Sequence, residues 1–163
     1  MRMKHSCRAF LAAWVVSGGI AAPAAGQTAP DAAARAEVVS VVEKLFDGMR
    51  ARDTVAIRSV FDPSARLVNA SGRGGGVSVT TVDQFVISIG RAPDGVELIE
   101  RIYAPEVRID SNLASVWTFY TFHRGEQFSH CGIDAIQLLR TAGAWKIVHI
   151  ADTRRTERCE PPG

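Results

Sequence analysis

A histidine, a cysteine and an aspartate lie within five positions of the apolar segment FSHCGIDAIQLL, residues 128–139. These residue types can bind a metal ion, form a nucleophilic centre or act as an acid–base pair. Because successive side chains of a strand point to opposite faces, His130 and Cys131 cannot both reach one ion. His130 and Asp134 do share a face. The histidines after residue 26 lack metal-ligand spacing, so we expect no metal site and no cofactor.

Regular hairpins at Gly125-Glu126 and Ala142-Gly143 would place Asp134 opposite Trp117, with His149 as a diagonal neighbour within side-chain reach. A buried carboxylate beside an imidazole suits acid–base catalysis, since burial raises the carboxylate pKa and the neighbour decides which group holds the proton. The same two side chains would equally satisfy each other's hydrogen bonds inside a packed core. Asp134 and His149 are therefore the candidate catalytic residues, and both interpretations stay open.

The same register predicts which side chains line a pocket with Asp134 and His149. The candidate ligand-binding residues on that face are Trp117, Phe119, Thr121, His130 and Ile136. The opposite face would carry Tyr120, Phe122, Cys131, Ile133, Val148 and Asp152. A single bulge would exchange the two faces beyond it.

The first 26 residues have the three-part pattern of a secretory signal peptide. A basic start is followed by an apolar stretch from Ala9 to Ile20 and then by the small residues of 22–26. The apolar stretch is shorter than the roughly 20 residues that span a bilayer, so we expect cleavage and no membrane attachment afterwards. The predicted localisation is secreted or periplasmic.

Removal of residues 1–26 changes the charge of the chain. The whole sequence has 19 basic and 17 acidic residues, of which three basic and no acidic ones lie in the leader, leaving 16 against 17. The mature chain therefore carries a net charge of −1, which removes the electrostatic basis for nucleic-acid binding. Its 137 residues suit one domain with one core.

Cysteine usage agrees with export. Cys7 lies in the leader, and the two remaining cysteines, Cys131 and Cys159, are predicted to form a disulfide in an oxidising compartment. The cross-link would stabilise the fold by about 3.5 kcal/mol in the loop-entropy description. In the assumed register Cys159 lies five residues beyond the partner of Cys131, so the tail 157–163 must fold back. A free Cys131 nucleophile is the alternative.

The rest of the chain predicts helices followed by strands. Residues 27–34 form a flexible tether, a helical pattern starts at Arg35, Asp53 caps a second helix, and Thr81-Val-Asp-Gln84 opens a third with a capping box. The glycine-rich segment 71–76 lacks the residues of a phosphate-binding loop and is predicted to be a plain loop. Period-two alternation then predicts strands at 96–103, 107–109, 114–123, 128–140 and 145–153, after a short strand at 66–69.

This order of elements is typical of an α+β fold: three helices in the N-terminal half packed on a curved, mostly antiparallel sheet. Together with the ending GAWKIVHIADTRR, residues 143–155, it resembles the nuclear transport factor 2-like superfamily, also called SnoaL-like. The last strand is similar to that of small bacterial members, including the group named putative lumazine-binding. The resemblance spans residues 35–156.

The resemblance implies a cone-shaped, cystatin-like α+β domain that encloses an apolar pocket and pairs as a homodimer through the sheet. The function expected first is a secreted protein that binds a small apolar or aromatic molecule. One alternative is an isomerase, dehydratase or hydrolase that uses Asp134 and His149. Another is a dimeric interaction module without a ligand, with an apolar seam formed by Tyr120, Phe122, Ile133 and Val148.

Overall fold

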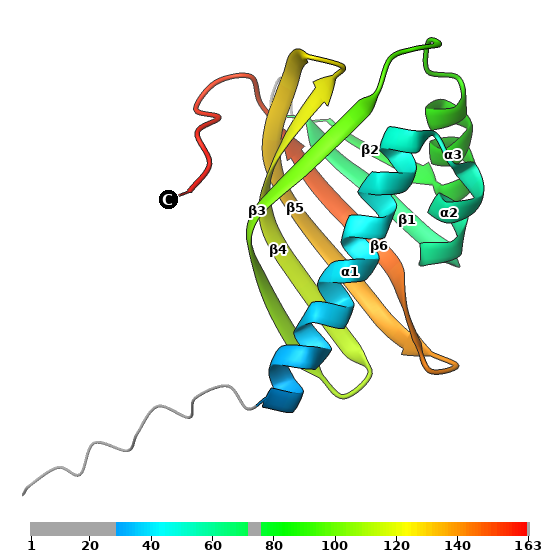
Figure 1. Cartoon of the computed structure of the whole chain (residues 1–163), viewed down its shortest axis with the longest axis vertical. Helices are drawn as coiled ribbons and strands as arrows, with labels where there is room; N and C mark the ends of the chain where they lie inside the picture. Colours follow the sequence, from blue (N-terminus) through cyan, green and yellow to red (C-terminus); the bar gives the residue numbers. More distant parts are fainter. Residues whose placement is uncertain (1–28, 72–75, 163) are drawn as a thin grey trace, which may run out of the picture.

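The computed structural model describes residues 29–71 and 76–162 (Figure 1). The predicted signal peptide and most of the glycine-rich loop lie outside these residues. Three helices and six strands follow one another along the chain: α1 (Ala29–Ala51), α2 (Thr54–Val60), β1 (Phe61–Ser71), β2 (Val77–Thr81), α3 (Val82–Gly90), β3 (Leu98–Asp110), β4 (Leu113–Arg124), β5 (Gln127–Thr141) and β6 (Ala144–Arg154).

The helices begin where local sequence signals predict, with one exception. Asp53 accepts hydrogen bonds from the backbone amides of Val55 and Ala56 and so caps α2, and Thr81 and Gln84 form the capping box of α3. Helix α1, however, starts at Ala29, so residues 29–34 are helical rather than a tether. Alanine is the strongest helix former and Asp31 lies in the first turn, where a negative charge stabilises the helix dipole.

The six strands form one sheet in the order β2-β1-β6-β5-β4-β3. Neighbours pair antiparallel except β1 and β6, which are parallel. This architecture, three helices against a curved and mostly antiparallel sheet, confirms the predicted fold class. Strand β2 was not predicted, and β1 extends well beyond the predicted residues 66–69.

The sheet bends at irregular positions that hydrophobic alternation does not reveal. Predicted strands 96–103 and 107–109 are one strand, β3, whose pairing with β4 shifts between Tyr103 and Glu106. Ala104 has φ +47 at this point, a left-handed conformation that is uncommon for alanine. Such bulges increase twist and curvature, which closes the sheet around one side of the molecule.

Two further bulges decide which residues face inward. One extra residue, Ser129, shifts the β4–β5 register, so Asp134 pairs with Thr118 instead of Trp117. One extra residue in β6 shifts the β5–β6 register, so Asp134 pairs with Asp152 and Gln137 pairs with His149. The predicted register was therefore wrong by one residue on both sides of β5.

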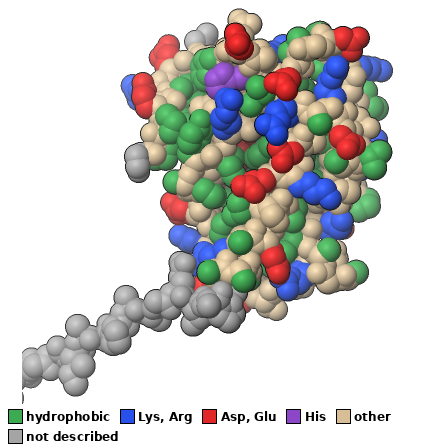
Figure 2. Space-filling model, viewed as in Figure 1, with side chains coloured by type: hydrophobic (Ala, Val, Ile, Leu, Met, Phe, Trp, Pro, Cys, Tyr) green, Lys and Arg blue, Asp and Glu red, His purple; other side chains and the backbone are tan. Residues whose placement is uncertain are grey.

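Helix α1 lies across the concave side of the sheet, and α2 and α3 close one end beside β1 and β2 (Figure 1). The largest fully buried side chains come from α1, α2 and the inward positions of β4, β5 and β6: Leu45, Ile57, Tyr120, Ile136, Leu138 and Ile147 are all less than 3% exposed. Acidic and basic side chains are interspersed over the helical face (Figure 2). None of the helices in the described part of the chain combines the length and apolarity needed to cross a bilayer.

The predicted disulfide is present. Cys131 and Cys159 are joined with their Cα atoms 5.6 Å apart. An isolated bridge pairs Cys131 with Arg155, one residue later than expected, and the chain after Arg155 folds back to bring Cys159 to the convex face of the sheet.

Candidate functional site

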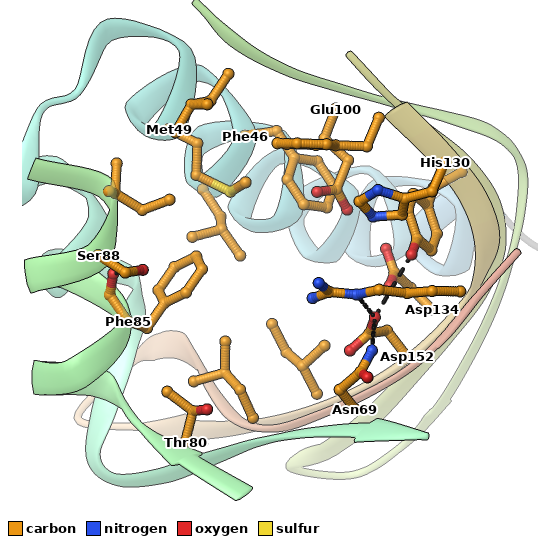
Figure 3. Close-up of a pocket in the computed structure, with 18 of the residues that line it drawn as sticks. Phe46, Met49, Asn69, Thr80, Phe85, Ser88, Glu100, His130, Asp134 and Asp152 are labelled. Carbon is orange, nitrogen blue, oxygen red and sulfur yellow. Dashed lines mark hydrogen bonds and ion pairs between the residues drawn. The ribbon is translucent and has the colours of Figure 1, made fainter. Parts of the chain in front are cut away.

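The concave side of the sheet and the helices enclose a cavity of about 710 Å³. Its two ends differ in chemistry (Figure 3). Helices α1 and α3 contribute apolar side chains such as Phe46, Met49 and Phe85, while Glu100, His130, Asp134, Asp152 and Asn69 gather at the opposite end on the strands. A cavity of this size with apolar walls and a few converging polar groups has the properties of a small-molecule site.

Asp152 is the centre of a hydrogen-bond network at the polar end. Its Oδ2 accepts from Asn69 Nδ2 at 2.7 Å, from Arg154 Nε at 2.8 Å and from the Tyr120 hydroxyl at 3.4 Å. The Tyr120 hydroxyl has one proton, and its shorter contact, 2.9 Å to the backbone carbonyl of Thr153, is the stronger of the two. Asn69 and Arg154 thus hold this carboxylate, with a weaker contact from Tyr120, and Arg154 supplies its counter-charge.

Glu100 and Asp134, two further carboxyl groups at this end, lie within hydrogen-bonding reach of each other. Asp134 is only 3% exposed, and its Oδ2 has no donor among the described residues. Burial, together with the nearby charge of Asp152, raises the pKa of Asp134 to about 7. Burial and the adjacent Asp134 raise the pKa of Glu100 well above its usual range. Two carboxyls this close retain a shared proton near neutral pH.

His130 lies above the carboxyl groups as a neutral ring. Its burial, with Arg154 nearby, lowers its pKa to about 4. The imidazole packs against Phe122 and Tyr120 at centroid distances of 5.0 and 5.7 Å, and Nδ1 is 3.0 Å from the hydroxyl of Ser129. It therefore adds hydrogen-bonding capacity and aromatic surface at pH 7 but no positive charge.

Residues 33–151 match the sequence model of a family described as putative lumazine-binding. The chain belongs to this family. No curated protein sequence matches it significantly. Solved structures share its fold, the cystatin-like α+β fold that the sequence predicts.

Three of these structures illustrate the likeness. An NTF-2 like protein of unknown function from Silicibacter pomeroyi is 19% identical, with a TM-score of 0.61 over 76% of this chain and 98% of its own. A cystatin-like protein of unknown function from Nostoc punctiforme is 11% identical, with a TM-score of 0.62 over 80% and 95%. A protein from Streptomyces avermitilis described as a putative dehydratase is 13% identical, with a TM-score of 0.62 over 78% and 99%. At these identities the likeness establishes the fold alone.

His149, the predicted neighbour of Asp134, does not line the cavity. His149 pairs with Gln137 on β5 and Arg66 on β1, so its side chain belongs to the convex face. Asp134 belongs to the concave face, opposite Asp152. The prediction that Asp134 and His149 form a pair was therefore wrong, because the extra residue in β6 turns every later side chain over.

The bulge in β5 has the same effect on three predicted ligand-binding residues. Trp117, Phe119 and Thr121 lie on the convex face, outside the cavity; Trp117 is 55% exposed and Phe119 packs under Arg155 and against Tyr103. His130 lines the cavity as predicted, whereas Ile136 is buried in the core beside it. The residues assigned to an outer seam, Tyr120 and Phe122, line the cavity instead.

Sequence reasoning missed Glu100, Asp152, Arg154 and Asn69. Glu100 could have been found, because it alternates with Leu98 and Ile102 at positions that predict an inward-facing side. An acidic residue at such a position marks a polar group inside a pocket or a core. Asp152 was assigned to the opposite face only because of the register shift.

The raised pKa of Asp134 predicts a pH-dependent stability. A carboxyl with a folded-state pKa of about 7 and an unfolded value of about 4 binds its proton more tightly when folded. The resulting stabilisation is fully present below pH 4 and is lost as the pH rises to about 7. The free energy of unfolding should fall by up to about 1.4 kcal/mol per pH unit in this window.

Asp134→Asn removes one of the two carboxyls whose pKa is raised and should reduce the pH dependence of the unfolding free energy, as measured by urea unfolding between pH 4 and 8. Asp94→Asn, which changes an exposed carboxylate, serves as the control and should keep the wild-type slope. An equal pH dependence of the unfolding free energy in wild type and Asp134→Asn would contradict the raised pKa of Asp134.

Proposed function

We propose that the protein binds a small, partly apolar or aromatic molecule in the cavity, with the polar part of the ligand at the carboxyl end. The observation that carries this proposal is the division of the 710 Å³ cavity into apolar walls and one end where polar groups converge around the buried Asp134. Burying a carboxyl such as Asp134 without a donor is costly, and a core selected for packing alone would avoid it. The acid–base alternative required His149 beside Asp134, so it is not part of the proposal.

The test uses the neutral dye N-phenyl-1-naphthylamine, whose fluorescence increases in apolar surroundings. We expect the wild-type protein to bind the dye and Ser88→Trp to weaken binding by about tenfold or more, because Ser88 faces the cavity and an indole there would occupy it.

Ser59→Trp is the matched control for Ser88→Trp. Both serines donate to the carbonyl three residues earlier, at 2.7 Å, but Ser59 lies on α2 outside the cavity. The control should keep wild-type dye affinity. An absence of dye binding, or equal binding by Ser88→Trp and wild type, would overturn the proposal.

We also propose that the protein acts outside the cytoplasm. The leader pattern of residues 1–26 and the disulfide between Cys131 and Cys159 support export, since such bonds persist in oxidising compartments. The mass of the chain isolated from the periplasm or medium should correspond to cleavage between Ala24 and Thr28. An intact precursor mass would contradict export with cleavage.

A homodimer that pairs through the sheet is supported by the convex face. Trp117, Leu113 and Phe128 are large apolar side chains that share this face and stay exposed in the single chain. Exposed apolar groups on one surface are typical of protein contacts. We expect a dimer by light scattering, and Trp117→Glu should give a monomer that still unfolds cooperatively, at a melting temperature that no longer depends on protein concentration. A monomeric wild-type protein would contradict this prediction.

A further inference from the structure

Carboxyl groups outnumber basic side chains at the polar end of the cavity. The strands bring three carboxyl groups together: Glu100 from β3, Asp134 from β5 and Asp152 from β6. Two basic side chains, Arg124 of β4 and Arg154 of β6, line the same cavity, and the Nε atom of Arg154 is 2.8 Å from Asp152. Of the carboxyls, Asp152 therefore forms an ion pair, whereas neither Glu100 nor Asp134 forms one within the described part of the chain, although the charge of Arg154 acts on both.

The donors around the carboxyl pair are directed elsewhere. Asn69 and the Tyr120 hydroxyl donate to Asp152 and to the carbonyl of Thr153. His130 is neutral because its pKa is lowered to about 4. The Oδ2 atom of Asp134 is left buried without a donor among residues 29–71 and 76–162. The pair thus has acceptor capacity that only a shared proton or a ligand can satisfy.

We propose that the cavity takes a small organic cation, an alkylammonium or amidinium group on an apolar body, with the charge against the Glu100–Asp134 carboxyl pair. The walls suit such a ligand: Phe122 and Tyr120 flank the polar end, and aromatic faces attract cations. Phe46, Met49 and Phe85 provide an apolar surface for the body of the ligand. This inference rests on the proposed function and adds the chemical class of the ligand.

Cation binding should release the proton that the pair shares. The other charged or titratable groups facing the pair are Tyr120 and Arg124 from β4, His130 from β5, and Asp152 and Arg154 from β6. Helices α1 and α3 and strands β1 and β2 add uncharged side chains to the lining. The pKa of Tyr120 is raised and that of His130 lowered, so both stay neutral between pH 5.5 and 8. The carboxyl pair is then the group that links affinity to pH, with the pKa of Asp134 at about 7.

Three probes of the same shape test the inference by isothermal titration calorimetry: 1-naphthylmethylamine, 1-naphthylmethanol and 1-naphthoate carry a positive, zero and negative charge. At pH 7.5 the amine should bind about tenfold or more tightly than the alcohol, and the naphthoate should bind most weakly. Between pH 5.5 and 7 the affinity for the amine should rise by up to about tenfold per pH unit, because the ionised fraction of the pair does so.

The double variant Glu100→Gln/Asp134→Asn keeps the shape of the pair and removes its charge. Its amine-to-alcohol affinity ratio should fall to about one and its pH slope should vanish. Glu106→Gln is the matched control: Glu106 lies on the same strand, pairs with Trp117 on the convex face, and is outside the cavity. This variant should keep the wild-type ratio and slope. Circular dichroism melting checks that each variant is folded.

The outcomes separate this inference from the function on which it rests. If the dye binds in the cavity but the amine binds no more tightly than the alcohol, the proposal of a cationic ligand is wrong. The proposed small-molecule binding is then unaffected. Tightest binding by the naphthoate would overturn it as well and would identify Arg154 as the ligand anchor. If N-phenyl-1-naphthylamine does not bind the wild-type protein, both proposals fail together.

Discussion

Substituting alanine for Gly132 is expected to lower the free energy of unfolding by about 3 kcal/mol or more. A Cβ at this position would lie 1.8 Å from the carbonyl oxygen of Thr153 and 2.9 Å from Cε1 of Tyr120. Contacts of this kind with backbone atoms cannot be relieved by a side-chain rotation. Strand β6 would have to move away from β5, and the 2.9 Å bond from the Tyr120 hydroxyl to Thr153 would be lost.

Thermal unfolding measures the effect of Gly132→Ala, which should lower the melting temperature by about 10 °C. Gly76→Ala is the control, because a Cβ there meets no atom within 4 Å and the backbone does not need a positive φ. That variant should stay within about 1 kcal/mol of wild type. If Gly132→Ala and Gly76→Ala have the same melting temperature, β6 does not approach Gly132 as closely as described. The position of Tyr120 at the cavity would then be wrong as well.

Loss of the disulfide is the second large expected effect. Cys159→Ser should lower the free energy of unfolding by about 3.5 kcal/mol, because the bond closes a long loop, with a sequence separation of 28 residues, that otherwise gains entropy on unfolding. The melting temperature should fall by about 10 °C. Cys131 is fully buried, so its freed thiol stays packed in the sheet, and the tail after Arg155 loses its attachment.

A reductant provides the internal control for Cys159→Ser. Reduced wild-type protein should melt at the temperature of the variant, and the reductant should leave the variant unchanged. A variant that melts within about 2 °C of oxidised wild type would show that the tail adds no constraint on the unfolded chain. Because the bond lies on the convex face, behind the strand that carries His130 and Asp134, its loss should also weaken binding of the cavity dye.

The two variants test different parts of one arrangement. Gly132 lies between His130 and Asp134 on β5 and lets β6 come close enough to supply Asp152. The disulfide holds the segment after β6 against the same stretch of β5. The polar end of the cavity therefore depends on close contact between the last two strands, which is where both substitutions act.

Local signals in the sequence determined several features correctly. Asp53 and the Thr81–Gln84 capping box mark helix starts because their side chains satisfy backbone amides within the same turn. Alternation located the long strands, and two cysteines that follow a leader-like sequence pattern predicted their bond. These signals involve neighbouring residues or a simple count. The start of α1 was missed because the alanine-rich segment 29–34 favours a helix through its composition but shows no apolar periodicity.

The site itself was decided by tertiary structure. Whether Asp134 meets His149 or Asp152 depends on one extra residue in β6, and whether Trp117 or Tyr120 faces the cavity depends on one in β5. Alternation has a period of two, so a single inserted residue reverses every position beyond it while leaving the pattern on each side intact. The sequence alone thus determined that a carboxyl and a histidine share a strand face over a pocket. Only the folded sheet, through its bulges and the packing of β3 beside β4, brought Glu100 to Asp134 and moved His149 to the opposite face.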